Sequence, residues 1–331
     1  YTLVQADVGT TTSVVISYND DQSESNTITL TAADPVDNVN DSPTGSVTIS
    51  GTATEDQVLT AANSLADEDG LGSITYQWNR AGTAIGSATS STYTLVQADV
   101  GSAITVTASY EDTLGQAESS TSAATSAVAN VNDAGSGLSL ASDGDVADPD
   151  QGDALSVTGT LADEDGVTNA APTYVWKRDG TAIGSATSSS YTLVQADVGT
   201  TTSVVISYDD DQSESNTITL TATSDVDNVN NNPTGSVTIS GTPTEDQVLT
   251  AANTLADEDG LGSISYQWNR AGTAISGATS TQYTLVQADV GSAITVTASY
   301  TDLQTTAESS TSAATSAVAN VNDNPTGSVA I

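Results

Sequence analysis

Residues 73–80 read SITYQWNR, and their polar and apolar side chains alternate along the whole stretch. Alternation with a period of two places Ile74, Tyr76 and Trp78 on one face of a β-strand. Neighbouring segments alternate in the same way and are separated by turn residues. Strands are therefore predicted at 45–50, 57–61, 73–80, 92–96, 102–110 and 117–128, with one more short strand ending near Ile85. This pattern, without a helical period, predicts an all-β fold of seven-stranded sandwiches.

The tryptophans and the few basic residues occur together. The tryptophans share the inward register of the strand tyrosines, which favours a core position over an exposed sugar-stacking platform: Trp78, Trp176 and Trp268. Each base follows one of them: Arg80, Lys177, Arg178 and Arg270. We expect the arginines to form structural ion pairs rather than bind a ligand, since guanidinium groups suit carboxylates: Arg80 with Asp99, Arg178 with Asp197 and Arg270 with Asp289.

A longer repeat divides the chain. The nonapeptide YTLVQADVG occurs at 1–9, 93–101, 191–199 and 283–291. Spacings of about 90–100 residues are too long for solenoid repeats and suit separate small domains. Residues 1–41 closely match 191–231, and residues 42–133 closely match 232–323, so two module types alternate. The predicted organisation is the C-terminal half of a module (1–41), three complete modules (42–133, 134–231 and 232–323) and the first strand of another (324–331), as expected of a window from a longer polypeptide.

The amino-acid composition excludes several classes of function. With 42 acids against 4 bases, the formal charge of −38 opposes binding to nucleic acids or anionic membranes and favours divalent cations. The absence of Cys and His excludes disulfides, Cys/His zinc sites and catalysis by either residue. No apolar run is long enough to span a membrane. Paired carboxylates can cleave glycosides, but here the same acids recur in every module, whereas an enzyme needs one dedicated cleft. No enzymatic activity is predicted.

Two sets of residues carry a resemblance to known families. One strand tryptophan, then a tyrosine strand, then QADVG before the next strand resembles an immunoglobulin-type sandwich, although the second cysteine of that family is absent. The unit TEDQVLTAANSLADEDGLGSITYQWNRAGTAI, followed by YTLVQADVG and NVND, resembles the tandem extender repeats of giant, type I-secreted, RTX-type bacterial adhesins. That resemblance implies immunoglobulin-like or cadherin-like modules arranged end to end, an extracellular or cell-surface location, and calcium binding.

The acidic residues are expected to meet where modules join. In an antiparallel sandwich, the loops carrying Asp67, Asp69, Glu111 and Asp112 return to the pole where the chain enters the module. The opposite pole carries Glu55, Asp56, Asp99 and the exit segment NVND at 130–133. Calcium takes six to eight oxygen ligands with tolerant geometry, so clustered oxygens without bases suit Ca²⁺ better than Mg²⁺. NVND before a proline also resembles the cadherin linker, and Asp67-x-Asp69 resembles the Asp-x-Asp pair of that family.

Each candidate calcium ligand lies in one of three kinds of segment: an exit segment, the turn near residue 55 or its repeat, or an Asp-x-Asp loop. They are Asn38, Asn40, Asp41, Glu55, Asp56, Asp67, Asp69, Asn130, Asn132, Asp133, Asp163, Asp165, Asn228, Asn230, Glu245, Asp246, Asp257, Asp259, Asn320, Asn322 and Asp323. Asn231 replaces the terminal aspartate of the exit segment at 228–231, so a weaker site is expected there. The alternative is that these residues are simply good linker formers.

Three functions remain open from the sequence. The first is a structural spacer that holds the adhesive tip of a secreted surface protein, with calcium stiffening contacts between neighbouring modules of the chain. The second is the subunit of a self-associating extracellular filament, because Ser/Thr-rich strands with few charges can pair with identical chains at a sheet edge. The third is a glycan- or protein-binding module. The sequence does not indicate an adhesive target.

Overall fold

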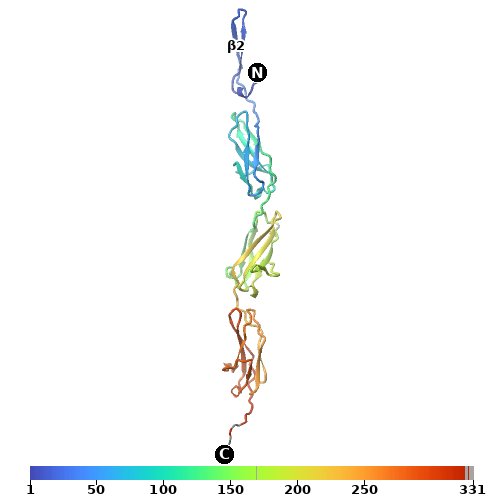
Figure 1. The fold of residues 1–331 in the computed structure, drawn as a ribbon, viewed down its shortest axis with the longest axis vertical. Helices are drawn as coiled ribbons and strands as arrows, with labels where there is room; N and C mark the ends of the chain where they lie inside the picture. The colour runs from blue at the N-terminus through green and yellow to red at the C-terminus, as the bar shows by residue number, and fades with distance from the viewer. Residues whose placement is uncertain (169, 325–326, 328–331) are drawn as a thin grey trace, which may run out of the picture. The chain divides into compact units, whose positions relative to one another are not determined.

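The alternating segments of residues 42–133 form two antiparallel sheets. A computed structural model describes residues 1–168, 170–324 and 327. One sheet has the order β3-β4-β7 and the other the order β6-β5-β8-β9. Figure 1 draws these strands in light blue to green. The strands are β3 (Val47–Ser50), β4 (Val58–Asn63), β5 (Thr75–Arg80), β6 (Thr83–Ala84), β7 (Thr92–Thr94), β8 (Ile104–Glu111) and β9 (Ala117–Thr121). The predicted all-β sandwich of immunoglobulin-like architecture is confirmed.

The same pair of sheets recurs twice more along the chain. Sheets β10-β11-β14 and β13-β12-β15-β16 repeat the arrangement, followed by sheets β17-β18-β21 and β20-β19-β22-β23. The first set contains β10 (Ser136–Ser142), β11 (Ala154–Ala162), β12 (Thr173–Arg178), β13 (Thr181–Ala182), β14 (Ser190–Thr192), β15 (Thr201–Asp209) and β16 (Ser215–Asp225). The second contains β17 (Val237–Ser240), β18 (Val248–Asn253), β19 (Ser265–Arg270), β20 (Thr273–Ala274), β21 (Gln282–Thr284), β22 (Ile294–Thr301) and β23 (Ala307–Thr311).

Each sandwich encloses one tryptophan. Trp78 on β5 is fully buried and packs with Leu59, Ile104 and Val106 from both sheets. Its indole Nε1 donates a hydrogen bond of 2.9 Å to the Ser90 carbonyl, which satisfies the one polar atom of the ring. Trp176 and Trp268 make the equivalent bond, at 2.9 and 2.8 Å, to Ser188 and Ser280. The predicted core role of all three tryptophans is confirmed.

The predicted strand at 117–128 is shorter in the structure. β9 ends at Thr121, and beyond it only isolated bridges form, at Ala127, Val128 and Ala129. Side-chain oxygens replace part of the backbone ladder, because Val106 N donates to Ser122 Oγ at 3.1 Å and Ile104 N donates to Thr125 Oγ1 at 3.0 Å. Ser and Thr side chains compete with backbone acceptors in this way, and the regular strand therefore stops.

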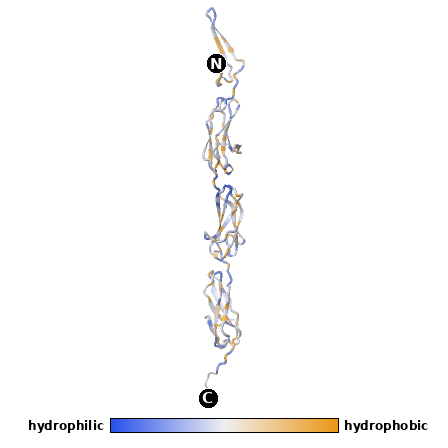
Figure 2. Cartoon of the chain, turned by 90° about the vertical axis from the view of Figure 1, so that its right-hand side faces the viewer, coloured by the Kyte–Doolittle hydropathy of each residue, from blue (hydrophilic) through white to orange (hydrophobic). Residues whose placement is uncertain are grey.

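Residues 1–41 contain a single hairpin of β1 (Ser13–Asn19) and β2 (Ser25–Thr31), with hydrophobic stretches along its strands and a hydrophilic tip (Figure 2). Val14 and Ile16 are 54% and 46% exposed there, whereas the equivalent Val204 and Ile206 on β15 are fully buried. Residues 13–18 and 203–208 have the same sequence, so a facing sheet decides the burial.

A short 3₁₀ turn follows the last strand of each three-stranded sheet. These turns, which also include one in residues 1–41, are η1 (Gln5–Asp7), η2 (Gln97–Asp99), η3 (Gln195–Asp197) and η4 (Gln287–Asp289). They hold the QAD motif of the repeated nonapeptide at the pole where the chain leaves the module. None of the helices in the described part of the chain has the length and hydropathy needed to cross a membrane.

Candidate metal centre

The QAD turn is fixed by an ion pair from the tryptophan strand. Arg80 Nε donates to Asp99 Oδ1 at 2.7 Å, while the Tyr93 hydroxyl and the Val96 amide each donate to Asp99 Oδ2 at 2.9 Å. Asp99 is completely buried. The pKa of Tyr93 is raised, first by the burial of the Tyr93 side chain and then by the hydrogen bond from its hydroxyl to Asp99. The predicted structural pairs are confirmed in the other modules as well, Arg178 with Asp197 and Arg270 with Asp289, both at 2.6 Å.

At the opposite pole, an Asp-x-Asp loop fixes the end of the preceding exit segment. Asp69 is 2% exposed, and its Oδ2 accepts a hydrogen bond of 2.8 Å from the Asp41 amide. Asp67 stabilises the loop from within, because its Oδ1 accepts the Asp69 amide at 2.9 Å. The Tyr110 hydroxyl also donates to Asp67. The hydrogen bond between Asp41 and Asp69 has equivalents in the next two repeats. The Asp133 amide donates to Asp165 Oδ2 at 2.8 Å, and the Asn231 amide donates to Asp259 Oδ2 at 2.5 Å.

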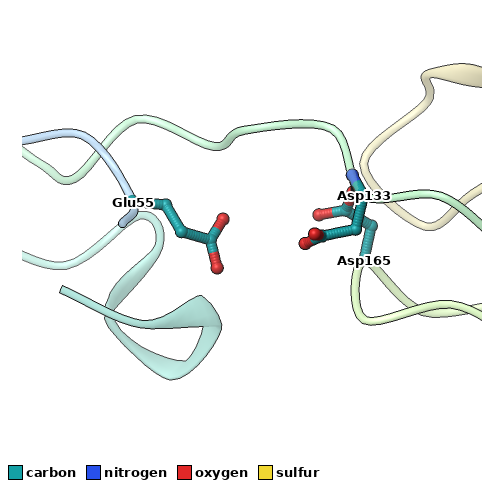
Figure 3. A group of neighbouring side chains, drawn as sticks. All are labelled: Glu55, Asp133 and Asp165. Carbon is teal, nitrogen blue, oxygen red and sulfur yellow. Dashed lines mark hydrogen bonds between the residues drawn. The ribbon is translucent and has the colours of Figure 1, made fainter. Parts of the chain in front are cut away.

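Three predicted ligands come together around residue 133. Glu55, Asp133 and Asp165 each place a carboxylate oxygen within 4.8 Å of the others (Figure 3). Figure 3 shows the Glu55 side chain directed at the pair formed by Asp133 and Asp165. Backbone contacts group the loop around Asp165 with residues 1–134 rather than with the sheets of its own module. The site therefore lies at the junction that follows residue 133, which we call joint 133/134.

Burial makes this cluster electrostatically unfavourable without a cation. Glu55 and Asp165 are each 3% exposed. Burial raises the pKa of Glu55; a hydrogen bond from the Val131 amide opposes this, and the Asp133 and Asp165 carboxylates add to the rise. Burial also raises the pKa of Asp133, reinforced chiefly by Asp165. Like charges in a low-dielectric setting raise a carboxyl pKa in this way, and a bound divalent cation reverses the effect.

Buried oxygens without a hydrogen-bond donor occur in the Asp-x-Asp loop, the exit segment and the QAD turn. Asp165 Oδ1, Asn130 Oδ1 and Gln97 Oε1 are buried and have no hydrogen-bond donor among the described residues. A buried acceptor left unpaired costs about 1–3 kcal/mol, so native proteins rarely retain several together unless something else meets them. The three carboxylates, one of which carries Asp165 Oδ1, and the two amide oxygens are all oxygen ligands of the kind that Ca²⁺ prefers. The set contains no nitrogen or sulfur ligand that would favour a transition metal.

The other predicted ligands have different surroundings. Asn38, Asn228 and Asn320 each accept a hydrogen bond from the QAD glutamine of their own repeat, at 3.4, 3.3 and 3.2 Å. Asn40 and Asn230 donate to Glu118 and Glu308, and Asn322 donates to the Asp323 carbonyl. Glu245 accepts the Val321 amide, while Asp257 accepts the Asp259 amide and the Tyr300 hydroxyl. Asp56 and Asp246 adopt positive φ in their turns, and Asn132 and Asp163 already interact with other groups.

The QAD glutamines are candidate site residues that the sequence analysis missed. Gln97 lies beside the exit segment, and its oxygen faces no donor. Gln5, its equivalent, donates from Nε2 to Asp69 Oδ1 at 2.6 Å, which shows that this side chain reaches the Asp-x-Asp loop. The signal was present, since a glutamine stands at the same place in all four nonapeptides. An uncharged amide within a turn motif, however, gives no indication of metal ligation.

Comparisons with known proteins find similar solved structures. No protein-family model and no curated protein matches the sequence. Among solved structures, the chain is similar to a Ca²⁺-stabilised, ice-binding adhesin of an Antarctic bacterium, with 15% identity, coverage of 93% of this chain and 81% of that one, and a TM-score of 0.30. It is also similar to the tetra-tandem repeat in the extending region of a large adhesion protein (18% identity, 93% and 82% coverage, TM-score 0.32).

A third similar structure is mouse cadherin-23 EC22–24, with 14% identity, coverage of 86% of this chain and 100% of that chain, and a TM-score of 0.31. These structures come from adhesin and cadherin repeats, the kinds of protein that the sequence resembles. Whole-chain TM-scores from 0.30 to 0.32 nevertheless carry no argument about function.

Proposed function

We propose that this chain is part of the spacer of a secreted cell-surface adhesin, in which calcium fixes the joint between consecutive sandwich modules. The modules are those expected from the repeat, at 42–133, 134–231 and 232–323, with parts of two more at 1–41 and 324–331. The observation that carries the proposal is the cluster at joint 133/134. There, Glu55 comes from one module and Asp165 from the next, and Asp133 ends the segment between them.

Calcium acts on the joint by bridging its two sides. Without a cation, the carboxylates repel one another and the buried oxygens are unpaired, so the contact between the modules is disfavoured. A cation that binds the assembled joint but not the separated one stabilises it by mass action, by about 2.7 kcal/mol at a free concentration 100-fold above Kd. A joint assembled in this way holds two neighbouring modules in one arrangement, which is what a spacer requires.

The chain's repetitive design supports a mechanical role rather than a catalytic one. The most conspicuous charged pairs, such as Arg80 with Asp99, serve to hold each sandwich together. The formal charge of −38 makes a chain of this kind soluble, and it makes its folding sensitive to multivalent cations. An extracellular location, where calcium reaches millimolar concentrations, fits both properties and weak extracellular calcium sites.

The test combines calcium binding with solution shape. Isothermal titration calorimetry on the full chain is expected to detect calcium binding that weakens in the double variant E55Q/D133N. Small-angle X-ray scattering is expected to show a larger maximum dimension with calcium than with a chelator. The control D21N/D34N removes the same charge from exposed positions outside the joints and is expected to behave as wild type. A maximum dimension that does not change on chelation would show that NVND is only a flexible linker.

A further inference from the structure

We propose that the joints are of two alternating kinds, and that calcium controls only one of them. Joint 133/134 binds the cation, whereas the joint that follows residue 231, joint 231/232, is closed by amide hydrogen bonds and keeps its geometry without one. This inference rests on the proposed function, because it concerns the same kind of site. It goes further in assigning each joint a different response to calcium.

The equivalence of positions at the two joints follows from their backbone bonds. Glu55 N donates to the Ala129 carbonyl at 2.9 Å, and Gln151 N donates to the Asp227 carbonyl at the same distance. The parallel bridges Thr54–Ala129 and Asp150–Asp227 flank these residues in the same way. Gln151 therefore stands where joint 133/134 has Glu55, although the turns on either side of it differ in sequence.

Besides the exchange of Glu55 for Gln151, the two joints differ in the last residue of the exit segment. The amides of Asp133 and Asn231 both donate to an Oδ2 of the following Asp-x-Asp loop, so these residues also occupy equivalent positions. Of the three carboxylates at joint 133/134, two are therefore amides at joint 231/232, and only Asp259 remains. The affinity of an oxygen site for calcium depends strongly on the number of charged ligands. The loss of two carboxylates therefore affects binding far more than the single exchange at residue 231.

The amides at joint 231/232 supply the donors that a cation otherwise replaces. Asn231 Nδ2 donates to Gln195 Oε1 at 3.4 Å, and Gln195 Nε2 donates to Asn228 Oδ1 at 3.3 Å. At joint 133/134 the corresponding oxygens, Gln97 Oε1 and Asn130 Oδ1, have no donor among the described residues. At joint 231/232 this glutamine is therefore hydrogen-bonded to the exit segment, which the Asn231 amide in turn ties to Asp259, whereas at joint 133/134 the oxygen of the equivalent glutamine is left for a cation.

Two buried oxygens at joint 231/232, Gln151 Oε1 and Asp259 Oδ1, also lack a donor among the described residues. Water protons satisfy such acceptors where the group is polar, and one carboxylate alone does not create the repulsion that three do. These two oxygens therefore call for hydration rather than for a divalent ion.

Parts of the two patterns recur at the neighbouring junctions, although the exit segment before residue 42 ends in Asp41 where joint 231/232 has Asn231. At the junction after residue 41, Gln5 Nε2 donates to Asn38 Oδ1 and to Asp69 Oδ1, so a glutamine amide again satisfies the Asp-x-Asp loop. Towards the other end, Glu245 Oε2 accepts the Val321 amide at 3.1 Å, as Glu55 Oε2 accepts the Val131 amide at 3.3 Å. The glutamate turn thus returns with the module type that carries it.

A charge-exchange experiment tests the alternation. The variant Q151E/N231D gives joint 231/232 the three carboxylates of joint 133/134, and E55Q/D133N makes the reverse change. Calcium binding to the full chain is measured by calorimetry, with D21N/D34N as the charge-matched control. Q151E/N231D is expected to add one tight site, and E55Q/D133N to weaken one site by roughly 100-fold, about tenfold for each carboxylate removed.

The outcomes separate this inference from the proposed function. If the wild-type chain binds no calcium, the proposed function is wrong, and the alternation with it. If the wild type binds calcium but Q151E/N231D adds no site, or E55Q/D133N removes none, the joints do not differ as inferred, while calcium binding itself stands. The fluorescence of the buried tryptophans, measured on each variant, confirms that the sandwiches remain folded.

Discussion

The ion pair between Arg80 and Asp99 at the QAD turn is expected to stabilise its module measurably. In the variant R80M, the Asp99 carboxylate stays fully buried and keeps the Tyr93 hydroxyl and the Val96 amide, but it loses its counter-charge. Breaking a buried ion pair costs about 3–5 kcal/mol. Because the Arg80 side chain is itself 31% exposed, part of that cost is screened by water. We therefore expect a loss of about 2–3 kcal/mol in the free energy of unfolding.

The assay is guanidinium denaturation followed by tryptophan fluorescence. A module of this size has an m-value of about 2 kcal/mol/M in guanidinium, so its midpoint is expected to fall by about 1 M. The chain has 3 tryptophans, one in each sandwich, so only one third of the fluorescence change is expected to move. The control K177M removes a base for which no ion pair is found among the described residues. Superimposable curves for R80M and K177M would refute the structural role of the pair.

Two further predictions concern acidity and packing. The pKa values of Glu55 and Asp133 are raised above their ordinary values of 4.5 and 3.8. The assembled joint therefore still binds protons in a pH range just above these values, where the separated joint has lost them. In a chelator, acidification through that window is therefore expected to stabilise the joint, whereas calcium affinity measured by calorimetry is expected to fall. In the second, G72A is expected to destabilise its module by about 1–3 kcal/mol in thermal unfolding, because a Cβ there lies 2.0 Å from the Glu111 carbonyl oxygen. G86A, where a Cβ meets nothing within 4 Å, is the matched control and is expected to change stability little.

The sequence predicted most of what depends on local patterning. Alternation located the strands, and the register of Trp78 placed it in the core, because burial on one face imposes a period of two. The pairing of Arg80 with Asp99 was predictable because four bases among many acids leave few structural roles open. The end of β9 was not, since Ser122 and Thr125 replace backbone acceptors only through a three-dimensional contact.

The proposed ligand set of the joint was only partly predictable. Acidic residues at the right poles indicated Glu55, Asp133 and Asp165, because antiparallel connectivity fixes the pole at which each loop lies. The part played by Gln97 and Gln151 was not evident, since an amide acts as donor or acceptor according to its neighbours. Which of the two roles an amide takes depends on the residues across the joint, and no local sequence pattern records them.

The hydrogen bond from each tryptophan to a serine carbonyl has a practical consequence for anyone who studies this chain in solution. Three indoles in the same dry surroundings emit as one species, so the intrinsic spectrum reports the average state of the sandwiches. Events confined to the segments between them leave that emission untouched. A dye or spin label attached near residue 133 is therefore needed to observe the joints, and the native spectrum serves as an internal standard that the modules have not melted.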